Sequence, residues 1–172
     1  SFTHNWKAKG EDYYVLEELD DLLAFTEKEG DFLWGLAMHP YPKDLTAPAF
    51  WINDKDLTAD MNTPYVTFYN LEVYDKWIKD PSHFYKNGQK RMLILSENGT
   101  STPSYSEEDL NLQAAGACWT WKKVSALDGI DAIQWHSWMD NEGEFGLRLG
   151  LRKYRSDAYD RSEERRVGKE CR

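Results

Sequence analysis

The stretch Arg91-Met-Leu-Ile-Leu-Ser-Glu97 decides the fold, because its apolar centre carries no charge and a carboxylate follows after one serine. Such a run is typical of a strand that is buried on both faces, as the strands of a parallel sheet are. The segment 32–39 has the same character, and 130–136 is a third candidate strand. The sequence therefore predicts three buried strands, near 32–39, 91–97 and 130–136.

Amphipathic helices separate these strands. Apolar residues recur at helical spacing in three segments, 11–29, 68–78 and 110–127. The stop signals that follow them are Gly30, the Asp80-Pro81 pair and Gly129. Ser106 has the character of a helix cap before the third segment. This order predicts parallel strands that neighbour one another in chain order, joined by crossover helices, with an extended segment near 2–5 beside the first strand.

The composition limits the classes of function. With 172 residues, 41% of them hydrophobic and 15% aromatic, the chain is expected to fold around a core. A net charge of -9 argues against binding to nucleic acid, which requires basic surface. No apolar run approaches the roughly 20 residues that span a bilayer. Eight Trp and ten Tyr suit the stacking of sugar rings, although aromatic residues are also ordinary core material.

The two ends of the chain carry separate expectations. The sequence opens in what reads as the middle of a domain, so the absence of a signal peptide leaves the localisation open, and a secreted parent protein remains one reading. The segment 161–172 is dense in charge and has no apolar periodicity. We expect it to be a disordered tail that is not native to the fold, appended to a domain at 1–160.

An ionisable residue closes each predicted strand. Strict alternation places it on the face expected to point inward, and the residues of that face are Leu33, Gly35, Ala37 and His39, then Leu93, Leu95 and Glu97, then Ala132, Gln134 and His136. The carboxyl ends of parallel strands meet at one edge of a sheet. We therefore expect His39, Glu97 and His136 to converge there, with Tyr41 at the margin.

Four motifs together resemble a largely uncharacterised bacterial family of glycosidase-like TIM-barrel proteins. They are WGLAMHPYPKDL (Trp34 to Leu45), TPYVTFYNLEV (Thr63 to Val73), ILSENG (Ile94 to Gly99) and HSWMDN (His136 to Asn141). More distantly, the layout is similar to the retaining glycoside hydrolases of the large TIM-barrel clan. The resemblance implies an α/β fold, a (β/α)₈ barrel of which this chain supplies only the C-terminal half, about strands five to eight.

The resemblance also implies a site. Glu97 would be the catalytic nucleophile, and the general acid/base would lie on a strand upstream of this chain. The residues expected to bind the carbohydrate substrate are His4, Asn5, Trp6, His39, Tyr41, Trp51, His136 and Asp140. No cofactor and no metal are implied. Half a barrel would be inactive alone, and its open sheet edges would favour self-association.

Two alternatives remain open at this point. A carbohydrate-binding protein without catalysis would keep the aromatic residues and need no pair of carboxyl groups. A metal-dependent hydrolase would use histidines at the strand ends, namely His4, His39 and His136, although no His-x-His spacing is present.

Overall fold

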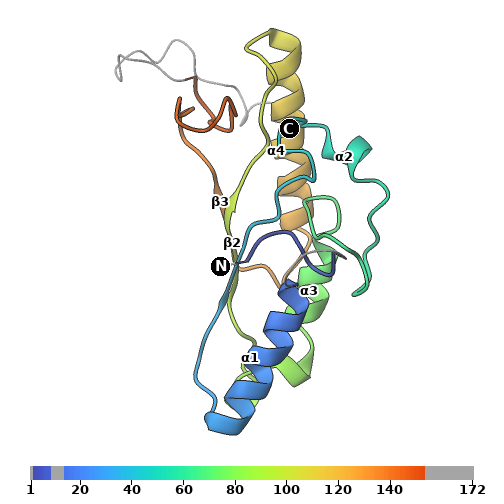
Figure 1. Ribbon diagram of the computed structural model, residues 1–172, viewed down its shortest axis with the longest axis vertical. Coiled ribbons are helices and arrows are strands. Elements are labelled where there is room, and N and C mark those ends of the chain that lie inside the picture. The colour runs from blue at the N-terminus through green and yellow to red at the C-terminus, as the bar shows by residue number, and fades with distance from the viewer. Residues whose placement is uncertain (1, 9–13, 154–172) are drawn as a thin grey trace.

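The computed structural model describes residues 2–8 and 14–153, and the tail expected at 161–172 lies outside them. The described residues contain a parallel sheet of three strands in the order β1-β2-β3 (Figure 1). The strands are β1 (Leu36–Met38), β2 (Leu93–Asn98) and β3 (Ala132–Trp135). The predicted direction and order of the strands are confirmed.

The extended segment expected beside the first strand is also present. Phe2 forms a parallel bridge with Met38, and its backbone N–H donates to the carbonyl of Ala37 at 2.8 Å. His39 in turn donates its backbone N–H to the carbonyl of Phe2 at 2.8 Å. The N-terminal segment is therefore anchored along β1.

The predicted (β/α)₈ barrel is wrong. The described residues form a small open sheet of three strands that does not close on itself. Closure requires strands that tilt and stagger by a fixed amount around a complete ring. The alternation of helix and strand in the sequence determines strand direction only, and open and closed parallel sheets share that direction. The sequence pattern therefore could not distinguish the two.

Two of the helices that precede β2 follow their predicted segments. They are α1 (Val15–Glu29) and α3 (Glu72–Ile78). α1 ends at Gly30, whose φ of 101° lies in the region that glycine adopts readily because it has no Cβ. After α3, the side chain of Asp80 accepts a hydrogen bond from the backbone of the next turn, the 3-10 helix η1 (Pro81–His83). Both helix ends therefore lie where the sequence predicts them.

The longest helix is α4 (Glu107–Val124). Ser106 Oγ accepts a hydrogen bond from the backbone N–H of Asp109 at 3.2 Å, which confirms the predicted cap. Two shorter elements have no signal in the pattern, the helix α2 (Phe50–Asn53) and the 3-10 helix η2 (Lys86–Gly88), because so few residues cannot establish a period. Within the described part of the chain, no helix combines the length and apolar character needed to cross a bilayer.

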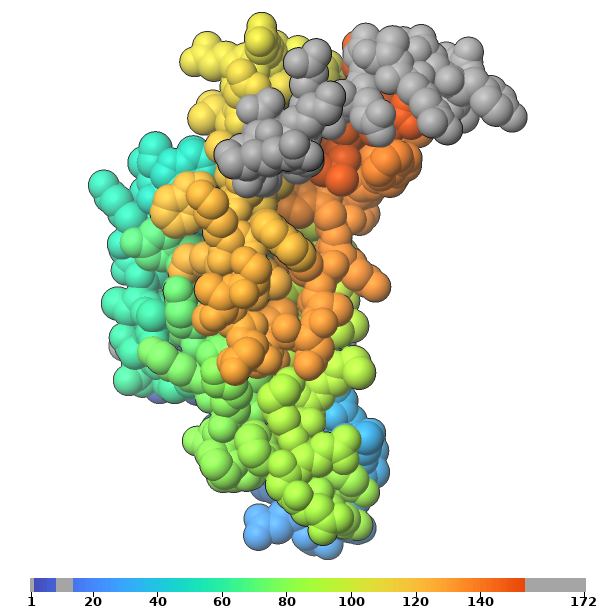
Figure 2. Space-filling model, turned by 180° about the vertical axis from the view of Figure 1, so that it is seen from behind, coloured from blue at the N-terminus to red at the C-terminus, as the bar shows by residue number. Residues whose placement is uncertain are grey.

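The core lies on one face of the sheet. Residues paired across parallel strands point to the same face, and the buried pairs are Leu36 with Leu93 and Met38 with Leu95. The paired residues of the opposite face are more exposed: Ala37, Ile94 and Ala132. Figure 2 shows α4 between the segment around α2, in teal, and the segment that follows β3, in orange.

Candidate active site

A β-bulge at the end of β2 sets the direction of Glu97. Leu95 pairs with Ile133 and Asn98 pairs with Trp135, so three steps along β2 oppose two along β3. The extra residue shifts the alternation of faces. Ile133 packs against the core and Trp135 stacks on a buried phenylalanine ring, so Asn98 faces the helices with them. Glu97 therefore points to the opposite, uncovered face.

The strict alternation expected from the sequence is wrong for this strand. Leu93 and Leu95 face the helices, not the inward face assigned to them together with Glu97. Buried Asn98 helps to hold the bulge, because its Nδ2 donates to the carbonyls of Leu95 at 3.0 Å and Gln134 at 3.1 Å. As a result the Glu97 side chain is 50% exposed at the carboxyl end of the strand.

Three residues near β1 surround Glu97 or support its neighbours. Tyr41 Oη donates to Glu97 Oε1 at 3.3 Å, and His39 Nδ1 lies 4.0 Å from Glu97 Oε2. His4 Nδ1 lies 3.1 Å from the carbonyl oxygen of Tyr41, and its ring meets the ring of Tyr65 edge to face. The structure thus brings His4, His39, Tyr41 and Glu97 together at one edge of the sheet.

The phenol of Tyr41 acts as a donor to Glu97. Burial, followed by the charge of Glu97, raises the pKa of Tyr41 well above its ordinary value. The phenol therefore keeps its proton across the physiological range and stays a hydrogen-bond donor to the Glu97 carboxylate. A carboxylate oriented in this way can attack an electrophilic carbon.

The raised pKa of Tyr41 predicts a difference in alkaline stability. The unfolded chain releases this proton near pH 10, whereas the folded protein retains it. The stability that the retained proton provides is therefore present below about pH 10 and is lost as the pH rises further. Thermal unfolding measured from pH 8 to 11 should show a steeper fall in Tm for the wild type than for Tyr41→Phe. If the Tm of the two proteins falls equally with pH, the raised pKa of Tyr41 is contradicted.

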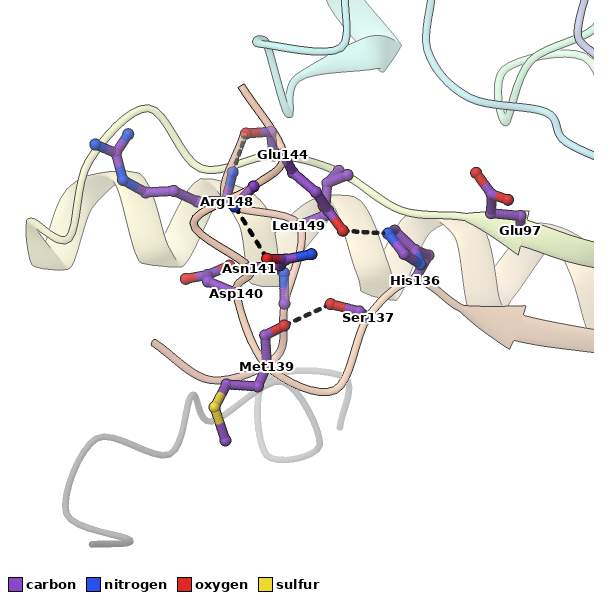
Figure 3. A network of polar contacts seen from close by, with 12 residues as sticks. Glu97, His136, Ser137, Met139, Asp140, Asn141, Glu144, Arg148 and Leu149 are labelled. Carbon is purple, nitrogen blue, oxygen red and sulfur yellow. Dashed lines mark hydrogen bonds and ion pairs between the residues drawn. The ribbon is translucent and has the colours of Figure 1, made fainter. Parts of the chain in front are cut away.

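A second carboxyl group lies beyond His136. The backbone N–H of His136 donates to the carbonyl of Asn98 at 2.7 Å, which places it beside the end of β2. Its Nε2 lies 2.9 Å from Glu144 Oε1. Figure 3 shows the His136 ring between Glu97 and Glu144. After burial and Glu97, the charge of Glu144 is the smallest cause of the raised pKa of Tyr41.

Sequence reasoning missed Glu144. It lies in a turn-rich segment after β3 without hydrophobic periodicity, and such segments give no information on where a side chain points. The available signal was an acidic residue between glycines, Gly143 and Gly146, close after a strand that ends in His136. Polar residues on loops beyond strand ends are common at functional sites.

Asp140, expected to bind substrate, braces the loop that carries Glu144. It is buried, its Oδ1 accepts from the backbone N–H of Gly150 at 2.8 Å, and its Oδ2 accepts from Tyr105 Oη at 3.0 Å. Its backbone N–H donates to the carbonyl of Arg152 at 2.8 Å. Asp140 therefore holds the two ends of the loop together.

Three other expected residues lie apart from this cluster. Trp6 is 1% exposed and packs edge to face on Tyr74 in the core, which removes it as a stacking surface. Asn5 bridges Tyr65 through the backbone. Trp51 stacks parallel to Trp119, and so packs against α4. The aromatic side chains expected as sugar platforms thus contribute mainly to packing between elements.

The described residues contain no group of three or more His, Cys, Asp and Glu side chains arranged to hold a metal ion. His4, His39 and His136 do not form such a group. His39 faces Glu97 and His136 faces Glu144, so each of these two histidines has a carboxylate partner.

Comparison with known proteins identifies a family for this chain. A family model described as a family of unknown function (DUF5722) matches residues 1–170. No curated protein and no solved structure matches the chain. Because the family model spans nearly the whole sequence, the chain belongs to the family of unknown function DUF5722.

Proposed function

We propose that this protein is a glycoside hydrolase in which Glu97 is the catalytic nucleophile. The observation that carries the proposal is the setting of Glu97 at the carboxyl end of a parallel strand. There a bulge turns its half-exposed carboxylate to the uncovered face, within reach of Tyr41 and His39. Ligands of open parallel sheets bind at this end of the strands. The resemblance of the four sequence motifs to glycosidase-like proteins supports the same assignment.

The proposed chemistry is a double displacement at the anomeric carbon of a sugar. The Glu97 carboxylate attacks that carbon while a second carboxyl group protonates the departing oxygen. Water then releases the sugar from Glu97. The hydrogen bond from Tyr41 orients the Glu97 carboxylate, and His39 lies close enough to bind a sugar hydroxyl beside it.

The substrate is a carbohydrate bound at the edge of the sheet. His4, His39, Tyr41 and His136 supply donors and acceptors for hydroxyl groups around Glu97. The acidic surface of the chain disfavours nucleic acid as a partner. The uncovered face and the exposed Leu33 and Met92 near the starts of β1 and β2 favour association of isolated chains with one another.

The test is hydrolysis of a panel of 4-nitrophenyl glycosides that covers the common hexoses and pentoses in both anomeric forms. The protein is assayed with any residues that flank this chain in its natural form. We expect release of nitrophenol from at least one glycoside, with the first sugar product retaining its anomeric configuration by NMR. If the protein cleaves no member of the panel, the proposal is overturned.

The alternative of a carbohydrate-binding protein without catalysis makes a different prediction for the same panel. Binding would be detected by saturation-transfer NMR, and no nitrophenol would be released. The presence of two carboxylates at one edge of the sheet, Glu97 beside Tyr41 and Glu144 beside His136, favours the hydrolase, because a binding protein has no need of the second one.

A further inference from the structure

We propose that Glu144 is the general acid/base of this site and that His136 positions it. The inference rests on the proposed function, since it assigns the second carboxyl group that the mechanism requires. It differs from the sequence expectation, which placed that group upstream of the chain. The described residues supply a candidate of their own, on the loop that follows β3.

The ends of β2 and β3 bring Glu97 and Glu144 to the same edge of the sheet. The backbone N–H of His136, the residue that holds Glu144, donates a hydrogen bond at 2.7 Å to the carbonyl of Asn98, the residue next to Glu97. At Gly99 a Cβ atom would overlap the carbonyl oxygen of His136. The ends of the two strands therefore approach as closely as the backbone allows. Glu97 comes from one strand end, and His136 with Glu144 comes from the other (Figure 3).

The loop after β3 holds Glu144 in a tight turn. The two residues after it, Phe145 and Gly146, both have positive φ, 54° and 87°. They turn the chain back so that the backbone N–H of Leu147 donates to the Glu144 carbonyl at 2.9 Å. A bulky residue with positive φ is uncommon and costs energy, and such strain tends to occur at functional sites. The turn and the His136 contact together fix the Glu144 carboxyl.

The two carboxyl groups have chemically different partners. Oε1 of Glu144 faces His136 Nε2, so the proposal assigns Oε2 to the substrate. Glu97 accepts a hydrogen bond from a phenol, which orients it for attack as a nucleophile. Glu144 is paired with a ring nitrogen that can either donate or accept a proton, as a group that cycles between acid and base needs. The different partners assign different roles to the two carboxyl groups.

Glu144 transfers a proton in both steps of the proposed double displacement. In the first step, the protonated Glu144 gives its proton to the glycosidic oxygen while the bond from that oxygen to the anomeric carbon breaks. The Glu97 carboxylate forms the new bond to the same carbon. In the second step, Glu144 takes a proton from water, the water oxygen bonds to the anomeric carbon, and the bond to Glu97 breaks. The products are the free sugar and the free alcohol.

The test compares two leaving groups on the sugar whose 4-nitrophenyl glycoside the protein cleaves fastest. A 2,4-dinitrophenyl glycoside departs without a proton, whereas a methyl glycoside requires one. For Glu144→Gln we expect kcat/KM to fall at least about 100-fold on the methyl glycoside and less than about 5-fold for the first step on the dinitrophenyl glycoside. Azide should rescue Glu144→Ala and yield a glycosyl azide, because azide needs no general base.

The controls separate this inference from the proposed function. Glu142→Gln changes an exposed acid on the same loop and should leave both rates at wild-type values. Partial unfolding lowers both rates together, so the ratio of the two rates reports the role of Glu144 itself. Suppose that the wild type is active, that Glu97→Gln is inactive, and that Glu144→Gln has the same ratio of the two rates as the wild type. That result would overturn the role of Glu144 and leave the proposed function standing. An inactive wild type would overturn both.

Discussion

Replacing Glu97 by Gln should abolish glycoside turnover while sugar binding is largely retained. We expect kcat to fall at least about 10⁴-fold, because removal of an enzyme's catalytic nucleophile has cost that much or more where it was measured. The amide has the shape of the carboxylate and can still accept the hydrogen bond from Tyr41, which is 3.3 Å long in the wild type. It cannot attack the anomeric carbon. The measurement is kcat on the most rapidly cleaved 4-nitrophenyl glycoside, with binding of the same sugar by calorimetry.

Two controls make this result specific. Glu27→Gln removes an exposed carboxylate near the end of α1. This residue lies away from the carboxyl ends of the strands, so the variant should leave kcat unchanged. Retained sugar binding by Glu97→Gln excludes misfolding as the cause of lost activity. Hydrolysis by Glu97→Gln at a rate near that of the wild type would remove Glu97 from the mechanism.

The sequence predicted local features well because local chemistry determines them. The helix at 11–29 ends at Gly30, as a residue without Cβ at positive φ requires. Ser106 caps α4 because its hydroxyl serves a backbone N–H three residues on. The helix stop and the cap each involve only a few neighbouring residues. The apolar runs also became parallel strands in chain order, which is the commonest arrangement where helices alternate with strands.

Features that depend on distant residues were not predictable in this way. Closure of a barrel depends on how many strands join the sheet and on their stagger, which no single strand encodes. The bulge in β2 depends on how Asn98 meets Gln134 on another strand, so a strict alternation gave the wrong face for Leu93. Glu144 reaches the site through a turn at Phe145 that has no sequence period.

The aromatic residues show the same limit. Trp6 and Trp51 were expected to stack on sugar because exposed indole faces bind sugar rings. In the structure Trp6 is buried against Tyr74, and Trp51 lies parallel to Trp119. A tryptophan in a core and one on a sugar platform look alike in sequence, and only its neighbours distinguish them.

The largest loss of stability is expected from Arg91→Met. Arg91 opens the stretch that decides the fold and is 1% exposed. Its guanidinium donates to the carbonyls of His83 at 2.9 Å and Phe32 at 3.0 Å and to Asp31 Oδ2 at 2.6 Å, and it lies 3.9 Å from the centre of the Trp34 ring. These contacts connect the start of β2 with η1 and with the segment that leads into β1. Methionine fills similar space but supplies no donor.

The expected cost of Arg91→Met is about 3 to 5 kcal/mol in the free energy of unfolding, because one partner of a buried ion pair is left behind. Asp31 would keep its charge with no cation beside it, and its Oδ1 already has no hydrogen-bond partner. Urea unfolding followed by tryptophan fluorescence measures the change. The double variant Asp31→Asn with Arg91→Met removes the orphaned charge, so it should be more stable than Arg91→Met alone. A loss below about 1 kcal/mol for Arg91→Met would show that the buried guanidinium does not hold these segments together.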